Sequence, residues 1–462
     1  MNYYSTNKQA PMATLEKAVV KGLAEDRGLY MPECIKQLPK EFFDNIEKYS
    51  FQEIAYTVAD AFFGEDVEAE ALKKIVYDTL AFDCPVVKVE DNIYSLELFH
   101  GPTLAFKDVG ARFMARLLQY FINGSKDPKA PKDPKDFKDS KEVNVLVATS
   151  GDTGSAVANG FLGVDGIHVY VLYPKGKVSP IQECQFTTLG KNITAIEVDG
   201  VFDDCQALVK NAFMDKELNE HMRLTSANSI NVARFLPQAF YYFNAYARMK
   251  EIVNRQSANG EIVMCVPSGN FGNICAALFG HAMGLPVKRF IAANNANDIF
   301  YNYLKTGKYE PKPTKQTLAN AMDVGDPSNF ARIIDLYTRE DLRNDSNKEN
   351  STHEVITSLI SGATYSDEQI KETMRACYQQ TGYILDPHGA CGYQALKDNL
   401  QPGEIGIFCE TAHPAKFKEK VDAIDHIDVE IPERLAAFMK GTKQNVEMSK
   451  DFADFKAYLM KQ

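Results

Sequence analysis

From about residue 143 onward, short β-branched and apolar runs alternate with stretches in which apolar residues recur at helical spacing. This alternation is typical of βαβ units, because parallel strands covered by helices on both faces read as nearly continuous apolar runs. The pattern predicts an α/β fold, in which ligands bind beyond the carboxyl ends of the strands. The clearest predicted strands are residues 143–148, 168–172, 193–198, 261–266, 287–291 and 404–409.

The length of 462 residues exceeds the roughly 250–300 residues at which a single core usually stops growing. We therefore expect two or more packed units with room for a large site between them. The composition, 45% hydrophobic and 24% charged, is that of an ordinary globular protein.

The formal net charge of −11 disfavours a protein that binds nucleic acid or other polyanions, so any phosphate must be captured locally. No signal peptide is visible, and no run of ~18 apolar residues predicts a membrane span. We therefore predict a cytoplasmic protein with no membrane partner. Nine scattered cysteines without a C-x-x-C pair argue against a zinc ribbon, a redox pair or a disulfide scaffold.

One segment interrupts the pattern, since residues 123–142 carry a lysine at every third position among aspartates and prolines. The interleaved aspartates cancel most of the charge, which favours a solvated surface insert over a basic patch for nucleic acid. A second polar stretch, residues 344–352, reads as a surface loop.

Lys107 stands at the end of an apolar segment, residues 99–108, and directly before a helix predicted by Val109, Phe113, Leu117 and Phe121 at four-residue spacing. A lysine in partly apolar surroundings loses proton affinity, as a Schiff-base amine requires. The segment alone is equally consistent with a surface lysine at the start of a helix.

Two strand-to-helix loops have the composition of anion sites. Residues 148–156, Ala-Thr-Ser-Gly-Asp-Thr-Gly-Ser-Ala, offer hydroxyl donors and glycine turns before a helix N-terminus. A capped turn is the plainer alternative. Residues 267–273, Pro-Ser-Gly-Asn-Phe-Gly-Asn, form a similar cradle that matches neither a Walker loop nor a dinucleotide fingerprint, so we do not expect a nucleotide phosphate there.

A third loop, residues 410–417, offers a hydroxyl and a histidine at a strand end, which is a weak signal by itself. No Gly-x-Ser-x-Gly elbow of a serine hydrolase occurs. The histidines lack metal-ligand spacing, so no metal site is predicted.

Seven motifs in order resemble the threonine synthase family and together cover nearly the whole chain. They include Gly-Pro-Thr-x-Ala-Phe-Lys-Asp ending at Asp108, the two anion loops, and Thr-Ala-His-Pro-Ala-Lys-Phe from Thr411. The others lie at residues 4–6 with 22–33, at 321–330 and at 385–390.

The resemblance implies a lyase of amino-acid biosynthesis that uses pyridoxal 5′-phosphate to convert O-phospho-L-homoserine and water into L-threonine and phosphate. It also implies a monomer or homodimer with the tryptophan synthase β-like fold, fold type II: two α/β units with mainly parallel sheets. Residues 1–103 would form an N-terminal segment of the large domain, 104–230 the small domain with the lysine, and 231–462 the rest of the large domain.

The same resemblance assigns the site residues. Lys107 would hold the cofactor covalently, and Thr411 would bond its pyridine nitrogen. Arg is well shaped to clamp a phosphate through two nitrogens, which suits Arg234 to the substrate phosphate. The cofactor phosphate would be bound by Gly269, Asn270, Phe271, Gly272 and Asn273; the substrate carboxylate by Thr149, Ser150, Gly151, Asp152 and Thr153, with Asp152 also near the cofactor's 3′-oxygen; and the substrate phosphate by Asn228, Ser229 and Arg234.

Two features depart from the family pattern. Asn273 stands where many relatives have aspartate, which makes the cofactor-phosphate loop less negative, and the insert at 123–142 has no family counterpart. Two alternatives stay open: a serine or threonine dehydratase or cysteine synthase of the same fold, and a non-catalytic phosphate-binding module. Retention of Lys107 argues against the second.

Overall fold

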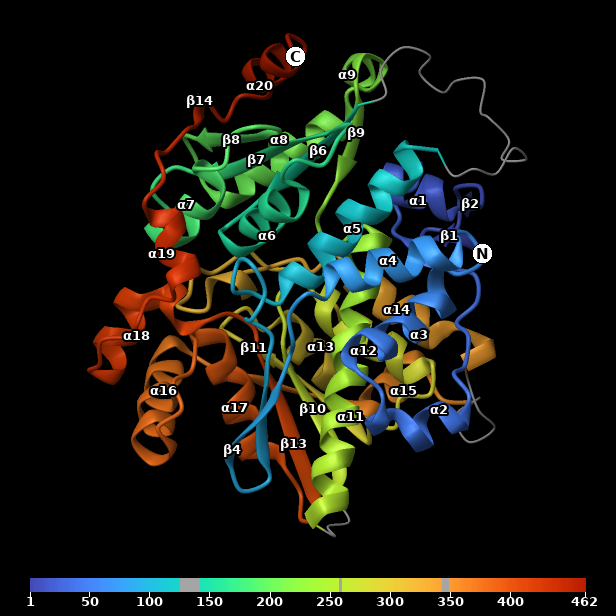
Figure 1. Cartoon of the computed structure of the whole chain (residues 1–462), viewed down its shortest axis with the longest axis vertical. Helices are drawn as coiled ribbons and strands as arrows, with labels where there is room; N and C mark the ends of the chain where they lie inside the picture. Colours follow the sequence, from blue (N-terminus) through green and yellow to red (C-terminus); the bar gives the residue numbers. More distant parts are fainter. Residues whose placement is uncertain (125–141, 257–259, 343–348) are drawn as a thin grey trace.

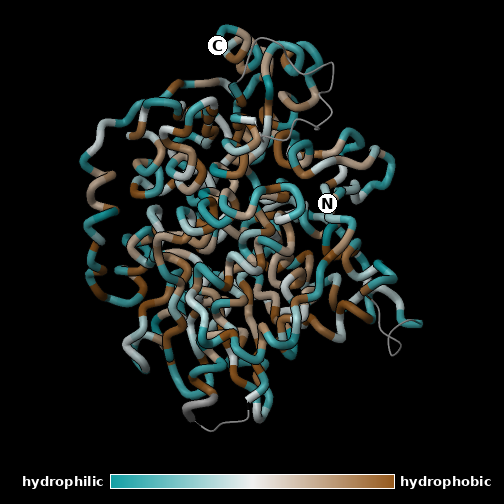
Figure 2. Tube along the Cα trace, turned by 45° about the vertical axis from the view of Figure 1, so that its right-hand side comes forward, coloured by the Kyte–Doolittle hydropathy of each residue, from teal (hydrophilic) through white to brown (hydrophobic). Residues whose placement is uncertain are grey.

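The computed structural model describes residues 1–124, 142–256, 260–342 and 349–462. Most of the lysine-rich insert and most of the second polar stretch therefore lie outside the described residues. Two mainly parallel sheets, one above the other in Figure 1, organise the chain. Figure 2 shows hydrophilic stretches along much of the outside of the molecule, while the largest apolar cluster joins buried residues from the N-terminal segment, α5 (Lys107–Ile122) and both sheets.

The larger sheet has the strand order β12-β11-β10-β13-β5-β4, and all its pairs are parallel except the β4–β5 hairpin. Strand β13 is buried at every position, and β10 and β11 at every position but the first, which explains their continuous apolar sequences. The strands are β4 (Val86–Glu90), β5 (Ile93–Glu97), β10 (Glu261–Pro267), β11 (Arg289–Asn294), β12 (Ile360–Thr364) and β13 (Glu404–Glu410).

The smaller sheet has the order β14-β8-β7-β6-β9, and every pair is parallel. A separate antiparallel sheet of three short strands forms the N-terminal arm. The smaller sheet comprises β6 (Val143–Ala148), β7 (Ile167–Pro174), β8 (Ile193–Val198), β9 (Arg223–Ser226) and β14 (Val446–Met448), and the arm comprises β1 (Asn2–Ser5), β2 (Ala13–Thr14) and β3 (Tyr30–Pro32).

The helices cover the sheets, and the six predicted strands and the predicted helix after residue 106 are all confirmed. Besides α5, they are α1 (Leu15–Lys21), α2 (Lys40–Asn45), α3 (Phe51–Phe63), α4 (Ala69–Thr79), α6 (Asp152–Phe161), α7 (Pro180–Thr187), α8 (Phe202–Met214), α9 (Lys216–His221), α10 (Val232–Phe235), α11 (Ala239–Gln256), α12 (Gly272–Ala282), α13 (Ile299–Thr306), α14 (Phe330–Thr338), α15 (Thr352–Leu359), α16 (Asp367–Thr381), α17 (Pro387–Asn399), α18 (Lys418–Asp425), α19 (Glu433–Met439) and α20 (Phe452–Leu459).

The C-terminal segment departs from the domain boundaries expected from the sequence. We assigned residues 231–462 to the large domain, but β14 pairs with β8, and Phe455 of α20 packs in the apolar cluster of the smaller sheet. Figure 1 shows β14 and α20 beside that sheet. Strand β14 is only three residues long, so its sequence has too little periodicity to predict that the C-terminal segment joins the smaller sheet.

Candidate active site

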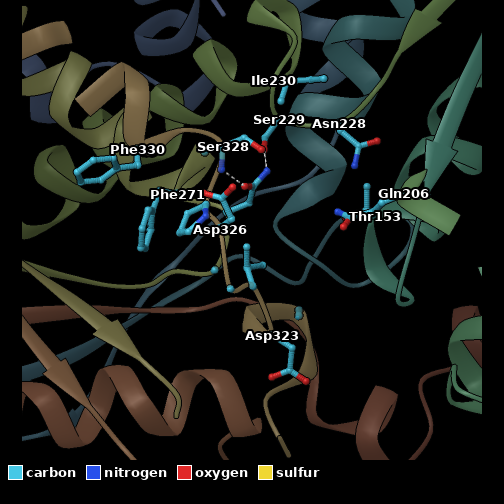
Figure 3. A pocket seen from close by; sticks show the side chains of 18 of the residues that line it. Thr153, Gln206, Asn228, Ser229, Ile230, Phe271, Asp323, Asp326, Ser328 and Phe330 are labelled. Atoms are coloured by element: carbon cyan, nitrogen blue, oxygen red, sulfur yellow. Dashed lines mark hydrogen bonds between the residues drawn. The ribbon is translucent and has the colours of Figure 1, made fainter. Parts of the chain in front are cut away.

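A cavity of about 890 Å³ lies where the carboxyl ends of strands from both sheets meet. Loops after β6, β9, β10 and β13 line it together with Lys107 and part of the N-terminal arm, as expected for parallel sheets. Figure 3 shows Thr153 and Asn228 on one side of this cavity and Phe271 and Phe330 on the other. The predicted site residues that line it are Lys107, Thr149, Ser150, Thr153, Asn228, Ser229, Arg234, Gly269, Asn270, Phe271, Gly272, Asn273 and Thr411.

Lys107 is the first residue of α5, and its side chain reaches this cavity. Burial lowers the pKa of its amine to about 8; the Asp152 carboxylate opposes the change, while Arg234 and Lys416 add to it. The turn before the lysine is fixed by Asp108, which accepts hydrogen bonds from the backbone N–H and the hydroxyl of Thr103, at 2.9 and 2.6 Å. The amine is thus held in place and is partly unprotonated near neutral pH.

The loop from β10 to α12 forms a cradle at a helix N-terminus. Phe271 adopts a left-handed backbone conformation with φ of 61°. A Cβ atom on Gly269 would lie 2.7 Å from the Cα of Met322, and one on Gly272 would lie 2.6 Å from the Cβ of Ser229. Only glycine fits these two positions, and the free N–H groups of the α12 N-terminus favour an anion in the cradle.

The amide of Asn273 holds this loop together rather than pointing its polar atoms at a ligand. Its Nδ2 donates to the carbonyl of Pro267 at 2.7 Å, and its Oδ1 accepts from the hydroxyl of Ser268 at 3.1 Å and the N–H of Ile274 at 2.9 Å. A carboxylate at this position could not donate to Pro267.

Asn270 connects the cradle to two other loops of the cavity. Its Nδ2 donates to the Ser229 hydroxyl at 3.1 Å, and its Oδ1 accepts from the N–H of Ser328 at 2.7 Å (Figure 3). The Nδ2 of Asn329 donates to the same Ser229 hydroxyl at 3.0 Å. Ser229 therefore lies at the boundary between the cradle and the loop that follows β9.

Arg234, on α10, brings to the cavity a buried cation that forms no ion pair with any described residue. Its Nε donates to the carbonyl of Ala227 at 3.1 Å, but its Nη1 has no hydrogen-bond partner among the described residues. Burial lowers the pKa of this guanidinium to about 10, so it stays charged near neutral pH. The same Nη1 lies against Gly110 of α5, the helix that begins with Lys107. A buried cation with a free donor is suited to bind an anion from the cavity.

His388 also lines the cavity, although sequence reasoning gave it no role. Its Nε2 accepts from the N–H of Ala321 at 3.1 Å, so the ring proton is on Nδ1, which lies 2.6 Å from the Asp386 carboxylate. The other oxygen of Asp386 accepts from the N–H of Ala412, next to Thr411. Both residues lie in motifs visible in the sequence, 321–330 and 385–390. The sequence alone did not reveal that these two motifs contact each other.

Some residues of the loop after β6 line the cavity, and others point into the protein interior. The Thr149 hydroxyl accepts from the N–H groups of Gly151 and Gly154, at 2.9 and 2.8 Å, and so shapes the loop. Gly151 and Asp152 do not line the cavity. The Asp152 carboxylate is instead 2.6 Å from the ammonium of Lys416 and accepts from Gln182 at 2.8 Å. The expected position of Asp152 near the cofactor's 3′-oxygen stays a prediction.

Other kinds of site have little support in the described ranges. They contain no group of three or more His, Cys, Asp or Glu side chains that could hold a metal ion. Within the same ranges, no helix is both long and apolar enough to cross a membrane.

Comparisons with known proteins agree along the whole chain. Residues 79–408 match the family described as pyridoxal-phosphate dependent enzyme, residues 2–80 match the threonine synthase N terminus, and residues 389–459 match the threonine synthase C-terminal family. The threonine synthase of Haemophilus influenzae is 43% identical over 461 residues, covering 100% of both chains.

Two solved structures show the same similarity in three dimensions. The crystal structure of threonine synthase from Escherichia coli superposes with a TM-score of 0.88 at 40% identity, with 100% of both chains covered. The structure of PLP-bound threonine synthase from Brucella melitensis gives a TM-score of 0.87 at 32% identity, with 100% of this chain and 99% of that chain covered.

Proposed function

The chain belongs to the threonine synthase family of pyridoxal-phosphate-dependent enzymes, and from this premise we propose how its own residues convert O-phospho-L-homoserine and water into L-threonine and phosphate. It is a lyase with the fold type II architecture. The observation that carries the proposal is that Arg234, whose buried Nη1 has no hydrogen-bond partner among the described residues, lines the same cavity as Lys107 and the glycine cradle. Such a cavity offers two anion sites, one for the cofactor's phosphate and one for the substrate's.

The residues present fit the cofactor. We assign its phosphate to the cradle of Gly269, Asn270, Phe271, Gly272 and Asn273, because Cβ-free backbone and a helix N-terminus suit that group. Thr411, which follows β13 and lines the same cavity, would offer its hydroxyl to the ring nitrogen. When bound, pyridoxal phosphate supplies an electron sink that stabilises negative charge at the substrate's α-carbon.

Lys107 would bind the cofactor and then, as a free amine, move protons at the substrate's α- and β-carbons. General-base catalysis is most effective when the pKa lies near the operating pH. A pKa of about 8 meets this condition, whereas an ordinary lysine would stay almost fully protonated. Burial is the main cause of that low value.

The substrate's two anionic groups would be held apart. Ser150, Thr153 and the start of α6 would bind the α-carboxylate, with Thr149 and Gly151 shaping that loop. Arg234 would bind the γ-phosphate through charge-assisted hydrogen bonds, with Asn228 and Ser229 beside it. Negative charge grows on the phosphate as it leaves, so a fixed guanidinium stabilises that step more than substrate binding.

A product assay tests the function. Purified protein supplied with O-phosphohomoserine should release threonine and phosphate in equal amounts. Phosphate accompanied by a 2-oxo acid and ammonia would instead indicate a dehydratase. We expect Lys107→Ala to remain folded but lose activity and the visible absorbance of the bound cofactor, while Lys74→Ala, at a surface ion pair, keeps both. A coloured, active Lys107→Ala variant would overturn the assignment. The cytoplasmic location and the monomeric or homodimeric state stay predictions.

A further inference from the structure

A buried ion pair joins three of the sequence motifs next to the cavity. Lys416 lies in the turn Pro414–Phe417, and its ammonium is 2.6 Å from the carboxylate of Asp152. The two side chains are only 0% and 3% exposed. The same ammonium donates to the carbonyl of Thr103 at 2.8 Å. Lys416 thus contacts both the turn that carries Lys107 and the start of α6.

The local sequence brings both partners to this contact. The Nδ1 of His413 accepts from the N–H of Ala415 at 3.1 Å and so caps the turn that carries Lys416. On the other side, Gly151 has a φ of 144°, and a Cβ there would lie 2.7 Å from Gln182, the residue that donates to Asp152. The glycine allows this close approach.

The position of the carboxylate has a consequence for the amine. Three charged groups act on Lys107: Asp152 favours its protonated form, whereas Arg234 and Lys416 disfavour it. Although burial opposes ionisation of Asp152, Lys416 and then Lys107 lower its pKa to about 2, so it is a carboxylate at any working pH. Without Lys416, the Lys107 ammonium would be the remaining cation that lowers the pKa of this carboxylate.

We propose that Lys416 is a positioning residue of the reaction: it holds the Asp152 carboxylate outside the cavity and prevents that carboxylate from keeping Lys107 protonated. The inference rests on the proposed role of Lys107. It gives a function to the Lys in the Thr-Ala-His-Pro-Ala-Lys-Phe motif and explains why Asp152, in the middle of the substrate loop, does not line the cavity. The alternative is a purely mechanical link between α6 and the loop after β13.

The two interpretations differ in the pH at which Lys107 becomes reactive. An unprotonated amine is needed to capture pyridoxal phosphate, so the capture rate of the cofactor-free full chain, followed by visible absorbance, reports the amine's pKa. We expect Lys416→Met to raise the midpoint pH of this rate by about one unit. Asp152→Asn should lower the midpoint. The rise caused by Lys416→Met should be much smaller in the Asp152→Asn background, because the carboxylate that Lys416 holds away is then absent. Lys418→Met, two residues away at a surface ion pair, is the matched control.

Each outcome decides the matter. Unchanged midpoints with a reduced urea midpoint in Lys416→Met would support the mechanical link and overturn the proposal. An equal rise in the wild-type and Asp152→Asn backgrounds would also overturn it, because Lys416 would then act on Lys107 without Asp152. If Lys416→Met does not fold, a double variant with the same midpoint as Asp152→Asn supports the proposal, and a midpoint about one unit higher overturns it. A wild-type chain that captures no pyridoxal phosphate would refute the role of Lys107 itself, whereas normal capture with the wrong order of midpoints refutes only the role of Lys416.

Discussion

Replacing Arg234 with leucine tests the assignment of the substrate phosphate. The change removes the buried charge and the free Nη1 donor while keeping an apolar side chain against α5. The cradle of Gly269 and Asn270 is untouched, so pyridoxal phosphate should still bind with its visible absorbance. We expect the turnover of O-phosphohomoserine to fall steeply.

The magnitude follows from the hydrogen bonds that Arg234 can make. Its Nε is already used by Ala227, which leaves Nη1 and the other amino nitrogen to contact the phosphate. Hydrogen bonds to charged groups contribute about 1.5–3 kcal/mol, and a clamp through two nitrogens lies near the upper end. A loss of about 2–3 kcal/mol corresponds to a fall of about 30- to 150-fold in kcat/KM. Arg234→Lys, which keeps the charge but not the planar fork, should fall in between.

A second effect must be separated in the assay. Arg234 also helps to lower the pKa of Lys107, so its loss leaves more of that amine protonated at neutral pH. The part of the defect caused by protonation should diminish as the pH rises above about 8, whereas the loss of the phosphate clamp should persist. Measuring kcat/KM from pH 7 to pH 9.5 distinguishes the two contributions.

Stability and side activity provide the controls. The Ala227 carbonyl loses its donor in Arg234→Leu, but a buried unpaired cation is removed as well, so the free energy of unfolding should change little. Any weak activity on unphosphorylated serine should survive, because that substrate has no phosphate to bind. If cofactor retention collapses together with turnover, Arg234 supports the fold and the phosphate clamp lies elsewhere.

Two further predictions concern the cofactor's contacts. Gly269→Ala should weaken pyridoxal phosphate binding at least tenfold in a fluorescence titration, because its Cβ would lie 2.7 Å from the Cα of Met322 and force backbone apart; unchanged affinity would place the phosphate outside the cradle. Thr411→Val should keep the cofactor but reduce kcat about two- to tenfold, the effect of one lost hydrogen bond, and identical kinetics would mean that another group contacts the ring nitrogen.

The sequence predicted those elements whose periodicity is set by burial alone. The strands β6 and β13 are buried at every position, so their apolar runs are continuous and unambiguous. By contrast, β12 reads Ile-Ser-Gly-Ala-Thr and is only half buried at an edge of the larger sheet. Such a strand is stabilised by hydrogen bonds to its neighbour's backbone rather than by burial of its own side chains. Its sequence therefore lacks the continuous apolar run that predicts a buried strand.

The site residues show the same contrast. The positions of some depend on their own loop, and those of others depend on contacts with distant parts of the chain. Residues whose position depends on their own loop, such as Gly269 and Thr153, line the cavity as the motifs suggested. The direction of the Asp152 carboxylate depends on Lys416, which is distant in the chain and reaches it because the loop after β13 packs on the start of α7, beside α6. A motif specifies which groups are available, but their partners are decided by tertiary contacts.

The contact between His388 and Ala321 extends this argument to two motifs to which we assign no ligand contact. Ala321 and Met322 pack against Gly269, while Asp386 bonds both His388 and the backbone beside Thr411. One path of packing contacts and hydrogen bonds therefore links the loop that would hold the cofactor's phosphate to the loop that would face its ring. Because the two ends of a rigid ligand must be held at a fixed separation, residues along this path can be essential to binding without contacting the ligand at all.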